Sequence, residues 1–395
     1  MRGFMIKRLL DELKIPKYPQ NLGDFYEKVP PVSILDKENL MRIEERFSPF
    51  GDFIPQMLEA IDKISEERAL LKYADLALSY LYECDGDDAA MLAMPDIKEN
   101  SVLRFFPALI LAALLPRGIA EYERRGFSEA EIFENLHGTF GARIAMSEKL
   151  CGLMGLDSSG FSWLRLYCYA KVFRAGSFNV TPKNLPDKII VLRNKDTSEL
   201  ALVMCDGEFH RSGKALGNKE YTDTVGAFSA NFYETDSEYI GNAVVDSAVS
   251  STPTVYEKSK WEILLQSGDA VAGIHIPRGA DLSPLVMKES FAKSLEMTRE
   301  RYPEFKARAL HCSTWMLDPQ LKEMLPPASR LVGFVDSFMK FPKRCPGNAV
   351  FTFVFDGRPT DLHDLPEDTT LRKKIKARYL SGGEINVHGG VMFID

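Results

Sequence analysis

Histidine and cysteine side chains lie on what the sequence predicts to be two strands of one sheet, residues 271–276 and 307–315. His275, near the end of the first strand, is a side-chain type whose ordinary pKa suits a general base. Cys312, on the second strand, could act as a nucleophile if its surroundings stabilised the thiolate. Both residues also fit structural roles, His275 as a hydrogen-bonded imidazole and Cys312 as a small buried hydrophobe.

Side-chain alternation limits how these residues can combine. Successive side chains of a strand point to opposite faces, so His311 and Cys312 cannot form one dyad. His275 shares a face with Val271 and Gly273. The sequence does not determine which face is buried.

The turn after the first strand has the composition of an anion-binding loop. It reads Pro277-Arg278-Gly279-Ala280-Asp281-Leu282-Ser283 and leads into a predicted long helix over 283–302. The N–H groups at a helix N-terminus converge on one point, with the positive end of the helix dipole behind them, and this favours phosphate. Gly279 would allow close backbone approach. In the structural alternative, Ser283 only caps the helix and Pro284 takes its first position.

The composition is that of a globular protein. The 395 residues include 49 Lys and Arg against 56 Asp and Glu, which gives a net charge of −7, and 45% are hydrophobic. This length predicts two or three domains, and the proportions exclude disordered, collagenous and disulfide-scaffold proteins. An acidic chain has no general attraction to nucleic acid or to anionic membranes. We therefore expect a small-molecule partner, with no nucleic acid and no membrane.

Targeting signals and cysteine usage indicate a compartment. Residues 1–10 lack the apolar core and cleavage site of a signal peptide. The apolar run 102–115 is shorter than the roughly 20 residues that span a bilayer, which predicts a buried core helix. The six cysteines are scattered and include no CxxC pair, which argues against a zinc ribbon and against a disulfide framework. The expected location is the reducing cytoplasm.

Hydrophobic periodicity divides the chain after Val172. Helical spacing dominates residues 39–172, interrupted by a predicted loop around Pro116 and Gly118. Ser128 and Glu131 have the spacing of a capping box. We expect a helical domain over 1–172 and an α/β domain over 173–395.

The second part alternates short strands with turns and then contains a strand–helix–strand unit with parallel strands. A short helix is predicted over 319–325, and the basic run 372–378 is predicted to be a solvated helix face. The predicted strands are 188–192, 199–204, 208–211, 228–233, 239–245, 261–265, 271–276, 307–315, 349–355 and, between two glycine turns, 385–388.

Several motifs can be discarded. Gly213-Lys214 follows Gly207 at one residue too many for a phosphate-binding P-loop. Asp85, Asp87 and Asp96 fall at calcium-loop positions 1, 3 and 12, but Ala89 and Ala90 replace an oxygen ligand and the turn glycine. The sequence contains no GxSxG, HExxH or GxGxxG.

The chain resembles a bacterial family of acyltransferase-domain proteins, in which a helical N-acyltransferase N-terminal domain precedes a GNAT-like C-terminal domain. The resemblance covers roughly residues 100–341. Its residues are Phe106-Pro107-Ala108-Leu109, Arg117 to Arg125, Phe161-Ser162-Trp163-Leu164-Arg165, Gly268-Asp269, His275-Ile276-Pro277, Gly279, Ser290, Cys312, Trp315, Leu317-Asp318-Pro319, Ser329, Phe334 and Phe338.

This resemblance implies an α+β protein whose mixed sheet opens between two parallel strands to admit the pantetheine of acetyl-CoA or another acyl-CoA. The strands would be 271–276 and 307–315, and the pyrophosphate would lie on the loop that follows the first. The implied function is acyl transfer to a small acceptor, most simply an amine, without a metal. The implied catalytic residues are His275 and Cys312, and the implied cofactor-binding residues are Ile276, Arg278, Gly279, Ala280, Asp281 and Ser283.

The sequence departs from the GNAT signature Q/R-x-x-G-x-G/A, because Gly279 follows Arg278 directly. A GNAT-derived domain that binds a metabolite without catalysis therefore remains the main alternative. A hydrolase that uses Cys312 or His275 is a third hypothesis. The sequence leaves the acyl group, the acceptor and the oligomeric state open.

Overall fold

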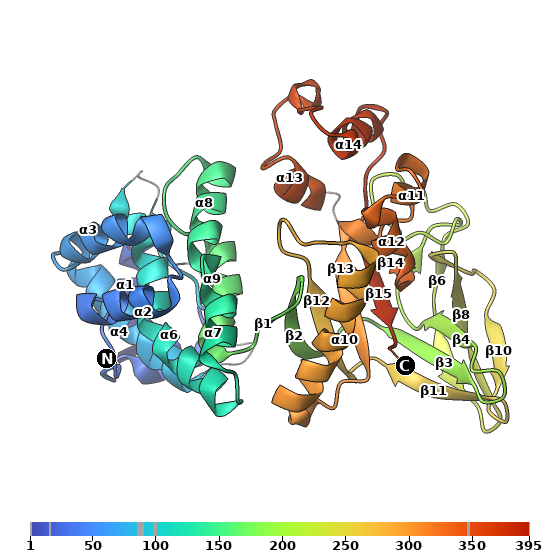
Figure 1. Cartoon of the computed structure of the whole chain (residues 1–395), viewed down its shortest axis with the longest axis horizontal. Coiled ribbons are helices and arrows are strands. Elements are labelled where there is room, and N and C mark those ends of the chain that lie inside the picture. Colours follow the sequence, from blue (N-terminus) through green and yellow to red (C-terminus); the bar gives the residue numbers. More distant parts are fainter. Residues whose placement is uncertain (1, 16, 85–90, 98–100, 346–347, 395) are drawn as a thin grey trace. The chain divides into compact units, whose positions relative to one another are not determined.

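A computed structural model describes residues 2–15, 17–84, 91–97, 101–345 and 348–394 (Figure 1). Asp85 and Asp87, considered above as calcium ligands, lie outside these ranges. The chain forms two compact units, Met1–Phe173 and Arg174–Asp395, where the sequence predicts a division after Val172. The first unit is helical and the second is built around mixed sheets, which confirms the predicted α+β class.

The helical unit is organised around α6 (Phe106–Arg124), which contacts α2, α3, α4, α7, α9 and η4. The predicted capping box is present, since Ser128 and Glu131 exchange hydrogen bonds at the start of α7. The other elements are α1 (Arg2–Glu12), η1 (Gln20–Phe25), α2 (Lys37–Phe47), η2 (Gly51–Phe53), α3 (Ile54–Ile64), α4 (Arg68–Glu83), η3 (Val102–Phe105), α7 (Glu129–Leu136), α8 (Thr139–Cys151), α9 (Ser158–Leu164) and η4 (Tyr167–Tyr169).

The loop predicted around Pro116 and Gly118 is wrong, because α6 continues through both residues. A proline inside a helix costs about 3 kcal/mol, and the burial of side chains such as Leu115 and Ile119 offsets this cost. Within the described ranges, Val102–Arg124 is the single helical stretch long and apolar enough to cross a membrane by length and composition. Its most apolar window is 72% buried in the structure, and a core helix passes the same test.

Gly118 allows η4 to pack directly on α6. A Cβ at this position would lie 2.5 Å from the carbonyl oxygen of Tyr167 and 2.7 Å from Cα of Cys168. The two backbones are therefore too close for any side chain. This constraint, rather than a turn, explains the glycine.

The second unit contains a first sheet whose described strands run in the order β1-β2-β12-β13-β15-β14. β12 and β13 are parallel, as predicted, and β15 is inserted between β13 and β14, antiparallel to both. The strands are β1 (Phe173–Ala175), β2 (Phe178–Asn184), β12 (Ala270–His275), β13 (Ala309–Thr314), β14 (Met339–Pro342) and β15 (His388–Met392).

Both faces of the first sheet are covered. α10 (Pro284–Arg301) packs on one face, where Phe291 stacks on Phe178 at 4.9 Å. On the other face Val271 and Ala309 share a hydrophobic cluster with Val191 and Leu202 of a second sheet. β12 and β13 are thus buried on two sides, as parallel strands generally are.

The second sheet is antiparallel and follows the path β10-β8-β4-β3-β11, with β7 and β9 also paired to β8. Its strands are β3 (Ile189–Asn194), β4 (Leu200–Met204), β7 (Phe232–Glu234), β8 (Glu238–Val245), β9 (Ala248–Val249), β10 (Thr254–Glu257) and β11 (Trp261–Gln266). The remaining elements are β5 (Glu208–Phe209), β6 (Phe228–Ser229), η5 (Pro303–Phe305), η6 (Trp315–Leu317), α11 (Gln320–Met324), α12 (Arg330–Asp336), α13 (Ala349–Val354), η7 (Leu362–Asp364) and α14 (Thr370–Leu380).

Two predicted strands are wrong. Residues 349–354 form α13, because Phe351 in the helix and Phe355 directly after it are four residues apart and both enter a cluster with Tyr379 of α14. Tertiary packing overrides the β propensity of this stretch. The final strand begins at His388, where the predicted strand 385–388 ends.

The shift of the final strand has a steric cause. The Gly389-Gly390 pair lies inside β15, where the sequence predicts a turn. A Cβ on Gly389 would lie 2.2 Å from the ring of Phe341, and one on Gly390 would lie 2.8 Å from Leu317. These glycines make room for neighbouring side chains within the sheet.

We predict that Gly118→Ala lowers the free energy of unfolding of the helical unit by about 2 kcal/mol or more, because the methyl group must displace backbone. Gly23→Ala is the matched control in the same unit, since its Cβ would meet only the tip of Ile6 at 3.4 Å. Urea unfolding followed by circular dichroism measures both. Equal stability of the two variants would contradict the close-packing argument.

Candidate functional site

His275 and Cys312 lie on adjacent parallel strands but on opposite faces of the first sheet. Gly273 pairs with His311 and Ile274 pairs with Cys312. By alternation His275 shares the face of Gly273 and His311. The structure therefore places His275 on the same face as His311 and separates it from Cys312.

Cys312 is enclosed in the core. Its side chain is 1% exposed, and burial raises the pKa of its thiol to about 12, although Lys183 and Lys343 oppose this shift. The thiol is neutral at physiological pH. This environment disfavours the thiolate that nucleophilic catalysis requires.

His275 of β12 lies among polar side chains of the neighbouring strand β2. Its Nε2 lies 3.0 Å from Oγ1 of Thr181. Burial lowers the pKa of His275 to about 3, and the positive charge of Lys183 adds to the effect. The space beside Gly273 is filled by these neighbours, since a Cβ there would lie 2.6 Å from both Thr181 and Lys183. His275 is consequently a neutral imidazole over the physiological range.

A charged cluster lies on the same face of the first sheet as His275, and this face meets the second sheet. His311 Nε2 lies 2.7 Å from one oxygen of Asp187, and Nζ of Lys343 lies 2.6 Å from the other. Burial alone would raise the pKa of Asp187, but the hydrogen bond from His311 and the charge of Lys343 outweigh it and lower the pKa to about 2. Both carboxylate oxygens are partnered, which indicates a structural role.

The predicted cofactor-binding loop is exposed at the start of α10. Arg278 donates to Asp356 at 2.5 Å, and Asp281 accepts from Arg330 at 3.1 Å. Ser283 is the N-cap residue, but its side chain makes no capping bond and its N–H donates to Asp281. Ile276 and Ala280 are half-buried beside these residues.

Gly279 has the backbone geometry and the space of a ligand-contacting glycine. Its φ is +80°, which favours glycine, and a Cβ there would meet nothing within 4 Å. The loop therefore leaves open space around Gly279, five residues before the first residue of α10. The cation of Arg278 is held at the same loop by Asp356.

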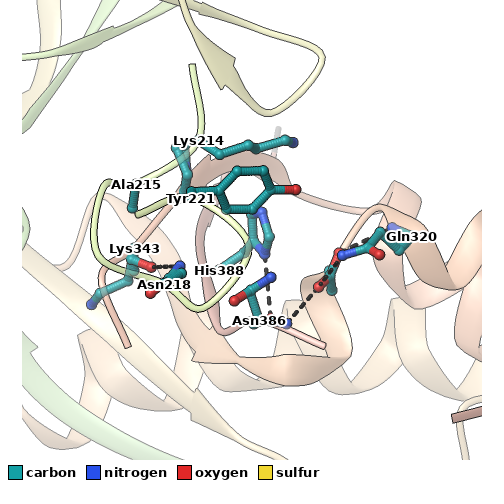
Figure 2. Close-up of a pocket in the computed structure, with 10 residues that line it drawn as sticks. Lys214, Ala215, Asn218, Tyr221, Gln320, Lys343, Asn386 and His388 are labelled. Atoms are coloured by element: carbon teal, nitrogen blue, oxygen red, sulfur yellow. Dashed lines mark hydrogen bonds between the residues drawn. The ribbon is translucent and has the colours of Figure 1, made fainter. Parts of the chain in front are cut away.

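A small, partly open pocket lies where the chain leaves β13 (Figure 2). Sequence reasoning missed it, because its residues come from four separated segments, one of which is Pro342-Lys343 at the end of β14. The loop 214–221 provides one side, the turn after β13 another, and the residues leading into β15 a third. The lining residues are Lys214, Ala215, Asn218, Tyr221, Asp318, Gln320, Pro342, Lys343, Asn386 and His388.

Asp318 holds the turn after β13 against the segment before β15. Its carboxylate accepts from the backbone N–H of Asn386 at 2.6 Å and from that of Gln320 at 3.0 Å. The side chain is 1% exposed, and burial raises its pKa to about 6 despite these hydrogen bonds. The one available sequence signal was Leu317-Asp318-Pro319, which the resemblance singled out without a role.

His388 and Lys214 are two further titratable residues of the pocket. His388 is 3% exposed, and burial lowers its pKa to about 3. Burial also lowers the pKa of Lys214, while Asp318 and Glu323 oppose the shift. Across the described ranges, no group of three or more His, Cys, Asp and Glu side chains could hold a metal ion.

Residues 203–392 match the family model of the GNAT-like C-terminal domain. This match confirms the resemblance inferred from the sequence for the second unit. β12, the loop to α10, β13 and the pocket residues all lie inside the matched GNAT-like segment. The chain matches no curated protein.

Solved structures of similar fold extend the likeness to the whole chain. One is a mutant acyltransferase in complex with octanoyl-CoA, at 16% identity and a TM-score of 0.68, covering 98% of this chain and 99% of that one. An acyltransferase in complex with CoA and 10C-teicoplanin has 16% identity and a TM-score of 0.67, with the same coverage. An acyltransferase in complex with decanoyl-CoA gives 18% and 0.65, again over 98% and 99%. At this identity the likeness shows the fold, with a helical part before the GNAT-like part.

The raised pKa of Asp318 gives a pH-dependent prediction. A carboxyl group whose pKa rises on folding contributes stability below pH 3.8 that is lost as the pH rises through about 6. A shift of about two units corresponds to on the order of 3 kcal/mol. We predict that Asp318→Asn, which cannot ionise, gains stability relative to the parent over this interval, measured by urea unfolding at each pH.

Asp187→Asn is the control, because the pKa of Asp187 is lowered to about 2. Its stability difference from the parent should change below pH 3.8 and stay constant above it. A pH-independent difference for Asp318→Asn would contradict the assignment of the raised pKa.

Proposed function

We propose that this protein transfers an acyl group from an acyl-CoA thioester to a small-molecule acceptor, most simply an amine. The observation that supports this most directly is the parallel pair β12 and β13, followed by an open glycine loop and a helix N-terminus within the GNAT-like segment. The similar solved acyltransferases hold octanoyl-CoA, decanoyl-CoA or CoA, and two of them hold a teicoplanin. A medium-chain acyl-CoA such as octanoyl-CoA is therefore the first donor to test.

The diphosphate of CoA would lie at the N-terminus of α10. The backbone N–H groups of the first helical turn, with the helix dipole behind them, provide a favourable local potential. This local potential acts against a net charge of −7 on the chain. Ile276, Arg278, Gly279, Ala280, Asp281 and Ser283 are the contacts that we propose.

Two polar side chains on this loop are already paired. Arg278 would have to exchange Asp356 for a phosphate, and Arg330 neutralises Asp281, which would otherwise repel the ligand. The ion pairs are exposed, so each costs little to rearrange. The loop can thus admit an anion without unfolding.

Acyl transfer requires a base for the acceptor and stabilisation of the oxyanion that develops on the thioester carbonyl. We propose His275 as the base, because it lies at the carboxyl end of β12, next to the proposed donor loop. Its pKa of about 3 makes it a weak base in the free protein, so this role depends on the bound substrates to favour the protonated ring. The burial and high pKa of Cys312 make a covalent acyl-enzyme on that residue the less favoured route. The free thiols among the described cysteines agree with a proposed location in the reducing cytoplasm.

Calorimetry with octanoyl-CoA tests donor binding. We predict that the parent binds and that Gly279→Trp weakens binding about tenfold or more, because the indole would occupy the open space beside the proposed phosphate contact at Gly279. Gly268→Trp is a matched control at the opposite end of β12, with φ +89° and equally open surroundings. No binding by the parent, or equal binding by both variants, would refute the proposed site.

Release of free CoA thiol from octanoyl-CoA in the presence of primary amines separates catalysis from binding. We predict amine-dependent release by the parent and a loss of about a hundredfold in His275→Ala, the lower range for removal of a general base. Tight binding without amine-dependent release would instead support the alternative, a metabolite-binding domain without catalysis.

A further inference from the structure

The floor of the pocket beside β13 contains two hydrogen-bonding atoms that the protein leaves unused. Nε2 of His388 and Oδ1 of Asn386 are buried and have no hydrogen-bond partner among the described residues. The two side chains are 3% and 4% exposed. Buried polar atoms are nearly always satisfied, so such a pair calls for a partner from outside the chain.

Both unused atoms are acceptors. Nδ1 of His388 lies 3.4 Å from the carbonyl oxygen of Asn386, and because a carbonyl can only accept, Nδ1 carries the hydrogen. Nε2 therefore presents a lone pair. Burial and the nearby charge of Lys214 keep the ring neutral by lowering its pKa to about 3. The floor thus requires a ligand group that donates hydrogen bonds.

The mouth of the pocket is built from the opposite kind of group. Lys214 donates to the carbonyl oxygen of Ser247 at 3.2 Å, which leaves two of its three donors for a ligand. Tyr221 adds a hydroxyl group on the same side, as Figure 2 shows. A ligand here meets acceptors at the floor and donors at the mouth.

The mouth loop is held in place. Asn218 donates to the carbonyl oxygen of Lys343 and accepts from the N–H of Cys345, both at 3.0 Å. The carboxylate of Glu220 accepts hydrogen bonds from the guanidinium group of Arg378 at 2.5 Å and from the backbone N–H of Glu384 at 2.9 Å. These four hydrogen bonds fix Lys214 and Tyr221 relative to the segment that contains Asn386 and His388.

The pocket lies at the edge of the first sheet where the parallel strands end. His388 pairs with Thr314, the last residue of β13, and His275 is the last residue of β12. Ligands of α/β sheets bind outside the carboxyl ends of parallel strands. The proposed donor loop begins at this same edge.

We propose that this pocket binds an amino group of the acyl acceptor, whose hydrogens are received by Nε2 of His388 and Oδ1 of Asn386. A primary amine has enough hydrogens for both acceptors, whereas a hydroxyl group has one. Lys214 and Tyr221 would then select an acceptor that also has a hydrogen-bond-accepting group close to the amine. This inference rests on the proposed acyl transfer for the ligand's role, but not for its binding.

The test uses ¹⁵N-histidine NMR of the full chain, which has six histidines. Unprotonated Nε2 of His388, assigned by its loss in His388→Gln, should move upfield saturably on titration with glycinamide at constant pH. Glycinamide has an amine beside a carbonyl acceptor; glycolamide, with a hydroxyl instead, should bind more weakly. If neither moves the resonance, or if only an ordered water occupies the site in a crystal soaked with glycinamide, the proposal is overturned.

Variants at the mouth provide a second readout. Tyr221→Phe and Lys214→Met should each weaken glycinamide binding about threefold to tenfold, the effect of losing one hydrogen bond. Lys376→Met is the matched control, since Lys376 is also a partly buried lysine, bonded to the carbonyl oxygens of His363 and Leu365, and does not line the pocket. Equal weakening in all three variants would contradict a specific subsite.

Octanoyl-CoA titrated into the same samples separates the two proposals. Glycinamide binding without octanoyl-CoA binding would leave the pocket assignment standing and refute the donor. Octanoyl-CoA binding without any glycinamide response would refute the pocket assignment alone.

Discussion

The parallel pairing of β12 with β13 is the constraint on which the second unit depends. Parallel neighbours cannot be joined by a tight turn, so the chain leaves the sheet after His275, crosses it as α10 and returns at Ala309. The crossover buries one face, and the second sheet buries the other. Both strands end at one edge, where the glycine loop and the pocket also lie.

Two buried carboxylates in this unit show how the same group serves different ends. Asp187 has His311 on one oxygen and Lys343 on the other, so its ionised form is favoured. Asp318 accepts hydrogen bonds mainly from backbone N–H groups, and these do not offset the rise in its pKa that burial causes. The first is a satisfied contact between sheets. The second lies beside His388, whose ring still lacks a partner for one nitrogen.

The sequence predicted what depends on local pattern. The capping box at Ser128, the long helix after Ser283 and the opposite faces of His311 and Cys312 all follow from spacing of a few residues. It failed where distant packing decides the outcome. Pro116 stays in a helix because α6 is buried on several sides. Residues 349–354 are helical because Phe351 and the following Phe355 pack in one cluster with Tyr379 of α14.

The candidate site also has one part that a local pattern predicts and one part that depends on distant packing. The loop after β12 was visible because its glycine, proline and helix-start residues are consecutive. The pocket was not, since Lys214, Asp318 and His388 are each about 70 residues or more apart in the chain. Single residues of this kind have no local signature. The pairing of β13 with β15 brings Asp318 and His388 together, and the hydrogen bonds of Asn218 and Glu220 hold the loop that contains Lys214.

The position of β15 also governs when the sheet can form. Residues 388–392 follow every other element in the chain, yet they separate β13 from β14. During synthesis the helical unit can fold as it emerges, whereas β13 and β14 must wait for this last strand before either has its final neighbour. The pocket, whose floor includes His388, therefore cannot form before residues 388–392 have been synthesised.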